Sequence, residues 1–475
     1  MAGTAPVTNE GWSSRTAFVL AAVGAAVGLG NLWRFPTLAG ENGGAAFVLV
    51  YIACVIFIGL PLVLSEVLIG RAGRKDAVES VVVVAEKSNV SPRWATLGWV
   101  ELLAAFLIMT TYSVVAGWVI YYAYNFGGDL LANLFAGNIF SGAFASDTPD
   151  QIQARMPNLF AQPGLMIALH ALFIVLTVGV VARGVQAGIE KAAMILMPAF
   201  FILLVAITIY SGLTGDFSKA SSFLFTPDFS KLSASVINDA LGQALFSMSL
   251  GSAALMTYGA YVSSETKLAP TATMIAFADT GVALIAGLMI FPIVFAAGLD
   301  PASGPTLMFQ SLPIAFHDMP GGSIVGFFFF VLVFFAALTS SISLVEAPTA
   351  WLINSKGWSR LQSAIVMGLT IFLVGVLGAL SFNVLSDVRP LAFWSLMEDQ
   401  DIFNSLDGLV GKLLLPIAAF LTAIFVGWKA DRKLIEAETG LEGGMFIFWR
   451  FLVSWVGPIA VGLILIFGLF PSLLG

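Results

Sequence analysis

A chain of 475 residues of which 59% are hydrophobic and only 10% are charged is too apolar to be a soluble globular protein. Its mean hydropathy of +0.95 and its repeated apolar runs of about 20 residues place it in a lipid bilayer. The net charge of −7 says little about partners, but no basic tract suited to nucleic acid is present. The single cysteine, Cys54, supports neither a disulfide nor a redox pair.

Eleven stretches are long and apolar enough to cross a bilayer as helices, and they predict an all-α polytopic membrane protein. They cover residues 16–38, 44–70, 96–126, 163–182, 190–213, 239–263, 271–298, 322–353, 361–383, 408–428 and 445–470. The first stretch has no basic segment before it and no small-residue cleavage site, so we expect it to stay in the protein.

The distribution of lysine and arginine predicts the orientation. If the N-terminus is cytoplasmic, 15 of the 21 basic residues fall on the cytoplasmic side, which is a positive-inside bias. We therefore expect a multi-pass protein of the cell (inner) membrane whose C-terminus lies outside. Residues 127–162 and 214–238 would then form ordered outer loops. Residues 299–321 form either a surface helical hairpin over a vestibule or a plain loop.

The first span is irregular, because Gly24, Gly28, Gly30, Asn31 and Arg34 all fall within eleven residues. Each glycine in a helix interior costs about 1 kcal/mol relative to alanine. Irregular backbone is tolerated at membrane depth only where it is buried in protein or lines a cavity. We therefore predict a broken helix that holds a ligand.

The sixth span is irregular as well, with Ser247, Ser249, Gly251 and Ser252 clustered near its middle. It lies five spans after the first irregular span. A duplicated unit of five helices inserts with opposite topology, so its two leading helices would face each other near the midplane. We therefore expect residues 1–475 to form one domain with repeats at 16–213 and 239–428 and an extra helix at 445–470. No similarity between the halves supports this duplication, which rests on spacing alone.

Several motifs in order along the chain resemble those of the sodium:neurotransmitter symporter family, especially its bacterial amino-acid transporters. These motifs are Val27-Gly-Leu-Gly-Asn-Leu-Trp-Arg-Phe-Pro36, Glu41-Asn-Gly-Gly44, Arg183-Gly, Gly188-Ile-Glu-Lys, Ser249-Leu-Gly251 and Leu338-Thr-Ser-Ser341. The resemblance implies a 5+5 inverted-repeat, leucine-transporter-like fold with broken helices 1 and 6 and an eleventh transmembrane helix.

The resemblance also implies a substrate site between the two broken helices. Its residues would be Ala26, Gly28, Leu29, Gly30, Ile108, Tyr112, Phe246, Ser247, Ser249, Ser252, Ala253, Ser340 and Leu344. The substrate carboxylate would meet the amides of Leu29 and Gly30 and the Tyr112 hydroxyl. Its ammonium group would meet backbone carbonyls and the Ser249 hydroxyl. Gly28 stands where monoamine transporters of the family carry aspartate, so we expect an α-amino acid substrate.

Two sodium sites follow from the same resemblance, each built mainly from neutral oxygens. The first would use Ala26, Asn31, Ser247 and Asp279 together with the substrate carboxylate. The second would use Gly24, Val27, Ala336, Thr339 and Ser340. An alternative for the hydroxyls of residues 339–341 is hydrogen bonding back to their own helix.

Asp279 departs from many members of the family, which have asparagine at this position. Chloride-dependent members bind the anion with residues that match Tyr51, Gln243 and Ser247 and with a serine where this chain has Ala283. A buried carboxylate at 279 could supply the negative charge itself. We therefore expect transport that does not require chloride. The alternative is a protonated Asp279 with a structural role.

Gating residues match the family less well. Arg34 matches the arginine of an outer ion pair, but Val410 aligns with its acidic partner, and Asp407, one turn earlier, could replace that acid. At the inner end we expect Trp12 and Tyr261 to pack together as part of the gate.

The inner ion pair of the family is replaced by two amides, Asn9 and Asn354, which predicts a weaker hydrogen-bonded latch or a latch elsewhere. On the fifth span, Gly188 and Pro198 permit two interpretations. They mark either local unwinding that hydrates the second sodium site or a static kink.

Taken with the resemblance, these residues indicate a sodium-coupled secondary active symporter that imports a neutral, hydrophobic L-amino acid by alternating access. Two sodium ions, the amino acid and the lipid bilayer are the expected partners, without nucleic acid or an obligate protein partner. An enzyme is not expected, because His170, His317 and Cys54 stand apart from one another. A non-transporting amino-acid sensor and a leak channel on the same fold remain alternatives.

Overall fold

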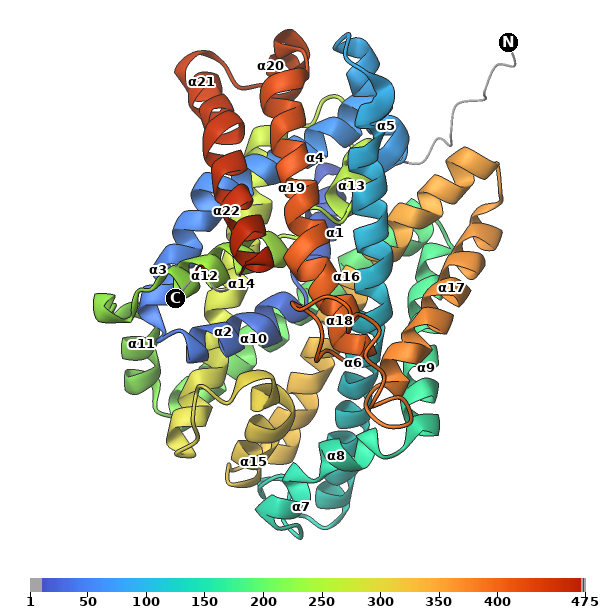
Figure 1. The fold of residues 1–475 in the computed structure, drawn as a ribbon. Coiled ribbons are helices and arrows are strands. Elements are labelled where there is room, and N and C mark those ends of the chain that lie inside the picture. The colour runs from blue at the N-terminus through green and yellow to red at the C-terminus, as the bar shows by residue number, and fades with distance from the viewer. Residues whose placement is uncertain (1–10, 471–472, 474–475) are drawn as a thin grey trace.

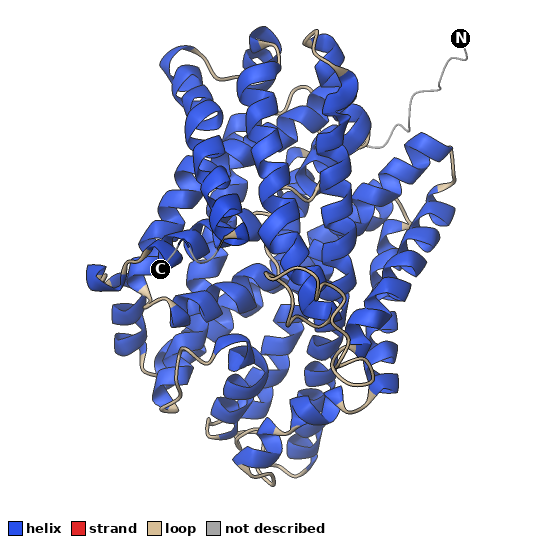
Figure 2. Cartoon of the chain, viewed as in Figure 1, coloured by secondary structure: helices blue, strands red, loops and turns tan. Residues whose placement is uncertain are grey.

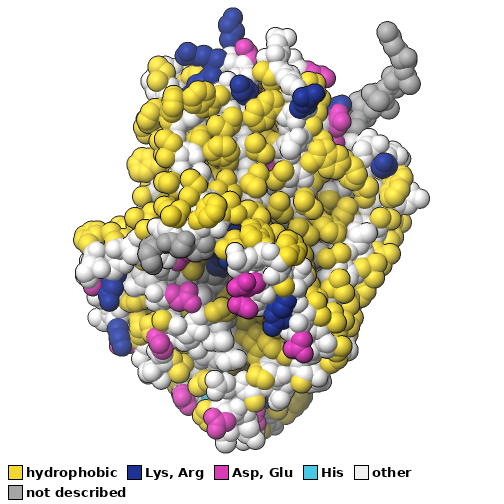
Figure 3. Space-filling model, viewed as in Figure 1, with side chains coloured by type: hydrophobic (Ala, Val, Ile, Leu, Met, Phe, Trp, Pro, Cys, Tyr) yellow, Lys and Arg dark blue, Asp and Glu magenta, His cyan; other side chains and the backbone are white. Residues whose placement is uncertain are grey.

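The computed structural model describes residues 11–470 and 473, and every regular element in these residues is a helix (Figure 2). Nine of the described helices are long and apolar enough to cross a membrane, and one bent pair makes a tenth. Figure 3 shows a broad belt of hydrophobic side chains with lysines and arginines gathered at its upper edge. This surface is that of a protein whose middle section faces lipid.

The nine continuous spans agree closely with the predicted ones; η marks 3-10 and π-helical turns. They are Ala45–Gly73 (α3, η2, α4), Pro92–Phe135 (η3, α6), Pro163–Val181 (α9), Val185–Thr214 (η4, α10), Leu268–Ala296 (α14), Gly322–Lys356 (α16), Arg360–Leu380 (α17), Ile402–Lys429 (α18, η8, α19, η9) and Gly443–Leu469 (α21, η10, α22). The helix ending at Phe135 continues well past the predicted end at 126. Hydropathy marks where polar residues begin, but a helix can continue into water.

Shorter helices lie at the two ends of the molecule (Figure 1). The end that carries α5 (Ala77–Lys87) and α20 (Arg432–Thr439) is here called the N-terminal face. The opposite end is the vestibule face, with α7 (Pro149–Gln153), α8 (Arg155–Phe160), α11 (Phe217–Phe225) and α15 (Leu312–His317). Residues 304–317 form one continuous helical run, so the segment 299–321 is neither a plain loop nor the expected hairpin of two helices.

The first span is broken, as the sequence predicts. Helix α1 (Arg15–Ala26) is followed by the π-helical turn η1 (Gly30–Arg34) and α2 (Phe35–Glu41), with a bend of 49°. A Cβ atom on Gly28 would lie 2.5 Å from the Ser340 hydroxyl oxygen and 2.9 Å from the Tyr112 hydroxyl oxygen. Only glycine fits there without displacing both side chains.

The sixth span is two separate helices, α12 (Ala234–Ser247) and α13 (Ala254–Ala260). In the segment between them, Ser249, Gly251 and Ala253 have φ angles of 54°, 77° and 58°. Such left-handed backbone is strained for serine and alanine and persists only where surrounding structure holds it. The wide break and the short α13 explain why this predicted span is absent from the ten apolar spans of the described residues.

Candidate functional site

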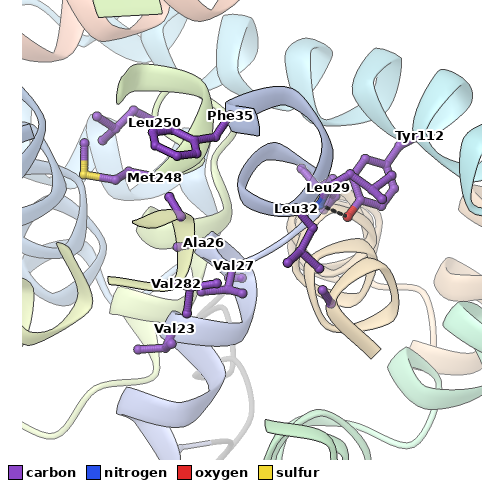
Figure 4. Close-up of a cluster of buried hydrophobic side chains, with 14 of the residues drawn as sticks. Val23, Ala26, Val27, Leu29, Leu32, Phe35, Tyr112, Met248, Leu250 and Val282 are labelled. Atoms are coloured by element: carbon purple, nitrogen blue, oxygen red, sulfur yellow. Dashed lines mark hydrogen bonds between the residues drawn. The ribbon is translucent and has the colours of Figure 1, made fainter. Parts of the chain in front are cut away.

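The break in helix 1 places backbone amides beside a tyrosine of α6 (Figure 4). Gly28 N donates to Asn31 Oδ1 at 3.0 Å, which closes the turn, and Leu29 N donates to the Tyr112 hydroxyl at 3.3 Å. Free amides at the start of a helical segment favour a negatively charged group. The geometry therefore suits a carboxylate that accepts the hydrogen bond from Leu29 N in place of the Tyr112 hydroxyl.

A buried polar cluster joins the two broken helices to α14. Asn31 Nδ2 donates to Ser247 Oγ at 3.0 Å and to Asp279 Oδ1 at 2.7 Å, and Ser247 Oγ donates to Asp279 Oδ2 at 2.7 Å. All three side chains are at most 1% exposed. Asp279 belongs to none of the ion pairs found within residues 11–470. Because an uncompensated buried carboxylate is costly at membrane depth, the cluster is suited to a small cation.

The surroundings of Asp279 match the predicted chloride region only in part. The Tyr51 hydroxyl donates to Ser247 Oγ at 3.4 Å, whereas Gln243 Nε2 donates to Gly30 O at 2.9 Å. Ala283 is fully buried and contributes no hydroxyl. Asp279 is thus the carboxyl group that lies beside these residues.

A second polar group joins α16 to the end of α1. Ser340 Oγ lies 3.2 Å from Gly24 O and 3.0 Å from Val27 O, so one hydroxyl faces two carbonyls that the sequence predicts as sodium ligands. Thr339 Oγ1 instead donates to Phe335 O and Ala336 O of its own helix. Thr339 also packs against Gly24, so the five predicted residues lie together, while the Thr339 hydroxyl adopts the alternative arrangement within its own helix.

A small cavity of about 30 Å³ lies between the broken helices. Eleven predicted substrate residues line it: Ala26, Gly28, Leu29, Gly30, Ile108, Tyr112, Phe246, Ser249, Ser252, Ser340 and Leu344. Ser247 is directed to Asp279, and Ala253 is buried as the left-handed residue before α13, so neither lines it. Leu415 of α19 lines the cavity too and escaped prediction, since a leucine in an apolar span carries no distinguishing pattern.

A larger cavity of about 480 Å³ opens on the vestibule face. It shares Leu29, Ile108, Tyr112 and Phe246 with the small cavity, so the two cavities adjoin at these side chains. The Arg34 guanidinium lies 4.5 Å from the centre of the Phe246 ring, a cation–π contact. Phe246 therefore acts as the partition between vestibule and small cavity.

The predicted outer gate residues line the same vestibule without touching. Arg34 and Asp407 both border it, but they do not form an ion pair within 4.0 Å in the described part of the chain. Arg34 also interacts electrostatically with Asp239 of α12, which the sequence interpretation missed. Two carboxyl groups, one of which lines the vestibule, thus interact electrostatically with one guanidinium.

The N-terminal face is closed by aromatic packing. The Trp12 ring lies 5.1 Å from Tyr258 and 6.2 Å from Tyr261, and Trp12 Nε1 donates to Tyr258 O at 3.1 Å. Tyr261 donates to Glu346 Oε1 at 2.7 Å, and the fully buried Glu346 pairs with Arg360 at 2.8 Å. The latch on this face therefore includes an ion pair at positions other than the predicted amides.

Only one of the two amides predicted to form a latch, Asn354, lies within the described residues. Asn354 Nδ2 donates to Asp76 Oδ2 at 2.9 Å, and Asn9 lies outside the described residues. Ser13 instead joins the N-terminal segment to η4, because its backbone N donates to Glu190 Oε2 at 3.0 Å. Gly188 lies within this π-helical turn and Pro198 within α10, an arrangement compatible with either interpretation of the fifth span.

Two buried carboxyl groups hold the unwound segment of helix 6, and the sequence interpretation missed both. Glu66 Oε1 accepts a hydrogen bond from Gly251 N at 2.7 Å. Glu101 is hydrogen-bonded to the backbone of Ala253, and its Oε1 also accepts from Thr422 Oγ1 of α19 at 3.2 Å. Both glutamates are fully buried. An acidic residue inside an apolar span is itself a signal of function, and it could have identified them.

Comparison with known proteins identifies a transporter family that matches most of the chain. Residues 9–132 and 151–472 match the sodium:neurotransmitter symporter family. The uncharacterized sodium-dependent transporter YhdH of Bacillus subtilis is 34% identical over 454 residues, 95% of each chain. An uncharacterized sodium-dependent transporter of Haemophilus influenzae is 34% identical over 471 residues, covering 97% of this chain and 98% of its own. A crystal structure of MhsT in complex with L-phenylalanine is 40% identical, covers 98% of this chain and 100% of its own, and superposes with a TM-score of 0.85.

Proposed function

Because the chain belongs to the sodium:neurotransmitter symporter family, a family of membrane transporters, we propose that it imports a neutral, hydrophobic α-amino acid coupled to sodium by alternating access. The fold is the leucine-transporter-like fold of MhsT, with broken helices 1 and 6. One observation carries the proposal. The amides of helix 1, the polar cluster of Asn31, Ser247 and Asp279, and an apolar cavity converge where the two breaks meet.

The substrate class follows from the chemistry around the small cavity. The Leu29 amide and the Tyr112 hydroxyl suit a carboxylate, and the carbonyls of the broken helices suit an ammonium group. Ile108, Phe246 and Leu344 provide apolar walls for a hydrophobic side chain. MhsT, similar over its whole length, has been crystallised with L-phenylalanine, which supports this class.

Two sodium ions would travel with the substrate. The first would be held by Ala26, Asn31, Ser247, Asp279 and the substrate carboxylate, and the cation would balance the buried Asp279. The second would be held by Gly24, Val27, Ala336, Thr339 and Ser340, where the Ser340 hydroxyl already faces two carbonyls. Direct contact between the first ion and the substrate would couple their movements.

We place the N-terminal face in the cytoplasm and the vestibule face outside, with the protein in the cell (inner) membrane and its C-terminus outside. The excess of basic residues on the N-terminal face supports this orientation. We likewise take residues 16–213 and 239–428 as the two inverted repeats, with residues 445–470 as the added helix. Substrate would enter through the vestibule past Phe246 and leave after the latch at Trp12 opens.

Transport by the purified protein in proteoliposomes tests the proposal. With an inward sodium gradient, radiolabelled phenylalanine or leucine should accumulate above its external concentration, and equal sodium on both sides should abolish this accumulation. Screening the twenty amino acids would identify the substrate. Sodium-dependent binding without accumulation would indicate a sensor, and ion conductance without substrate would indicate a channel. Either result would overturn the proposal.

A further inference from the structure

A surface groove lies on the N-terminal face where the start of α6 adjoins α19, apart from both cavities described above. It has a volume of about 390 Å³ and is lined by Ser91, Arg93, Trp94, Thr96, Leu97 and Leu421. The Trp94 ring lies 5.2 Å from that of Phe425 in η9, which fixes the two walls of the groove against each other. The groove is therefore a packed feature and not a gap between mobile loops.

One end of the groove is polar and positively charged. Arg93 is exposed, and its side chain makes none of the hydrogen bonds or ion pairs found across the described ranges. Ser91 Oγ accepts from Arg93 N at 3.3 Å, and Thr96 Oγ1 donates to Arg93 O at 2.9 Å, so two hydroxyls flank the arginine backbone. An uncompensated guanidinium beside hydroxyls can bind a phosphate through several hydrogen bonds.

The other end of the groove is apolar and continues along the membrane-spanning part of α6. Leu97 and Leu421 line it, and Trp99 and Leu103 follow Thr96 by three and seven residues, so they share its face of the helix. Trp99 is 47% exposed and Leu103 is 48% exposed. Exposed tryptophan near the end of a membrane span is typical of the interface with lipid headgroups. The surface thus passes from a cation to a hydrocarbon-facing stripe within two turns of helix.

We propose that this groove binds one anionic glycerophospholipid of the adjacent leaflet. Its phosphate would accept hydrogen bonds from the Arg93 guanidinium and from the Ser91 hydroxyl, and an acyl chain would follow Trp99 and Leu103. A zwitterionic lipid gains less, because its own cation opposes the arginine. The lysines and arginines gathered at the same end of the molecule in Figure 3 add to the preference for an anionic headgroup.

Native mass spectrometry of the full-length protein tests this inference. The protein is mixed with equal amounts of phosphatidylglycerol and phosphatidylcholine, and the retained lipid is counted. We expect the wild type to retain one phosphatidylglycerol preferentially. Arg93→Gln should lower that retention about fivefold, since one basic residue at the membrane surface contributes on that scale. Thr96→Trp, which fills the groove without changing charge, should lower it as well.

Lys433→Gln is the matched control, because Lys433 is an exposed cation of α20 on the same face and does not line the groove. This variant should retain phosphatidylglycerol as the wild type does. An equal loss in Lys433→Gln, or undiminished retention in Arg93→Gln, would overturn the inference. Millimolar inorganic phosphate should leave the bound lipid in place, and displacement by phosphate would show an anion site without specific lipid docking, which contradicts the proposal.

Discussion

Gly28 lines the small cavity at a point where there is no room for a side chain. Its missing Cβ would lie 2.5 Å from the hydroxyl oxygen of Ser340, which in turn faces the carbonyls of Gly24 and Val27. A side chain at this position therefore disturbs the proposed second sodium site as well as the substrate site. Because Gly28 has no carboxylate of its own, the backbone amides of Leu29 and Gly30 would bind a carboxylate that the substrate supplies.

Gly28→Asp should abolish binding of neutral amino acids. Two like unit charges 4 Å apart repel by about 4 kcal/mol at an effective dielectric constant of about 20, which is roughly a thousandfold in affinity. Gly28→Ala is the control for steric effects and should weaken binding by a smaller factor. Equilibrium binding of radiolabelled phenylalanine measures both variants. Equal losses in the two would show that charge is not the cause.

Asp279 places a buried carboxyl group beside Ser247, and position 283 carries no hydroxyl, so we propose that Asp279 provides the negative charge of this region. Uptake should therefore be unchanged when chloride is replaced by gluconate at constant sodium. Asp279→Asn should lower uptake strongly, because it removes the charge that balances the first ion. Initial rates of uptake in proteoliposomes measure both effects. A collapse of wild-type uptake in gluconate would contradict the assignment.

At the level of elements, the unwound segment between α12 and α13 depends on contacts from its neighbours. Gly251 has φ of 77°, its amide donates to Glu66, and an added Cβ would lie 2.9 Å from Leu415 O and from Ala418 Cβ. Glutamates on two other spans therefore hold a backbone that helix propensity alone would not form. The shape of the substrate cavity depends on this support, since Ser249 and Ser252 belong to the same segment.

Gly251→Ala should destabilise the protein by about 1–3 kcal/mol through backbone strain, with a further loss from the clash with α19. Gly242→Ala, in the interior of α12 with no atom within 4 Å of the new Cβ, is the matched control. It should be neutral or stabilising by up to about 1 kcal/mol. Thermal unfolding in detergent compares the two midpoints. A lower midpoint for Gly242→Ala than for Gly251→Ala would refute the interpretation.

Helix α5 begins at a buried acid whose ionisation opposes folding. Asp76 is 1% exposed, its Oδ1 accepts from Val78 N, and its Oδ2 accepts from Asn354 Nδ2. Burial raises the pKa of Asp76 above its ordinary value of 3.8, although these hydrogen bonds lower it in part. The folded state therefore binds this proton more tightly than the unfolded state, so the contribution of Asp76 to stability falls as pH rises through the raised pKa.

Asp76→Asn keeps an N-cap residue and should remove this loss of stability. The midpoint of thermal unfolding of the variant, relative to wild type, should rise with pH from about pH 4 upward. Asp228→Asn is a control for which the opposite pH trend is expected. Hydrogen bonds from Ser230 lower the pKa of the exposed Asp228, so the midpoint of this variant relative to wild type should fall as pH rises. A difference between Asp76→Asn and wild type that stays constant with pH would contradict the assignment.

At the level of the whole molecule, the two faces are closed to different extents. Phe246 and a few neighbouring side chains separate the small cavity from the vestibule, whereas Trp12, Tyr258, Tyr261 and the Glu346–Arg360 pair close the N-terminal face. The proposed alternating access would require the closure on the N-terminal face to open. Removal of one partner of a buried ion pair costs about 3–5 kcal/mol.

Arg360→Gln should therefore shift the protein towards a state that is open on the N-terminal face. The measurement is thiol labelling of Ala17→Cys, a buried position of α1, in a Cys54→Ala background. Labelling should become at least several-fold faster than with Arg360 intact. Arg155→Gln breaks the Arg155–Asp147 pair on the vestibule face and should leave labelling unchanged. Equal labelling of both variants would show general loosening instead.

The amino-acid sequence determined most of the fold and much of the candidate site. Apolar length located ten spans, the glycines of residues 24–30 located the first break, and the serines of residues 247–252 located the second. These features are local, since a bilayer imposes a fixed length of apolar helix and irregular backbone requires a protected environment. The eleven predicted residues that line the small cavity follow from the resemblance, which carried the family's site residues over position by position onto four separate spans.

Only the tertiary structure decided which distant residues meet. It paired Glu346 with Arg360, joined Glu66 to the break of helix 6, added Leu415 to the cavity and turned Ala253 away from it. It also placed Arg93 of one span beside Leu421 of another to form the groove. Periodicity and motifs along one helix describe its own composition, whereas these contacts depend on how helices far apart in sequence pack and on where an unwound backbone directs each side chain.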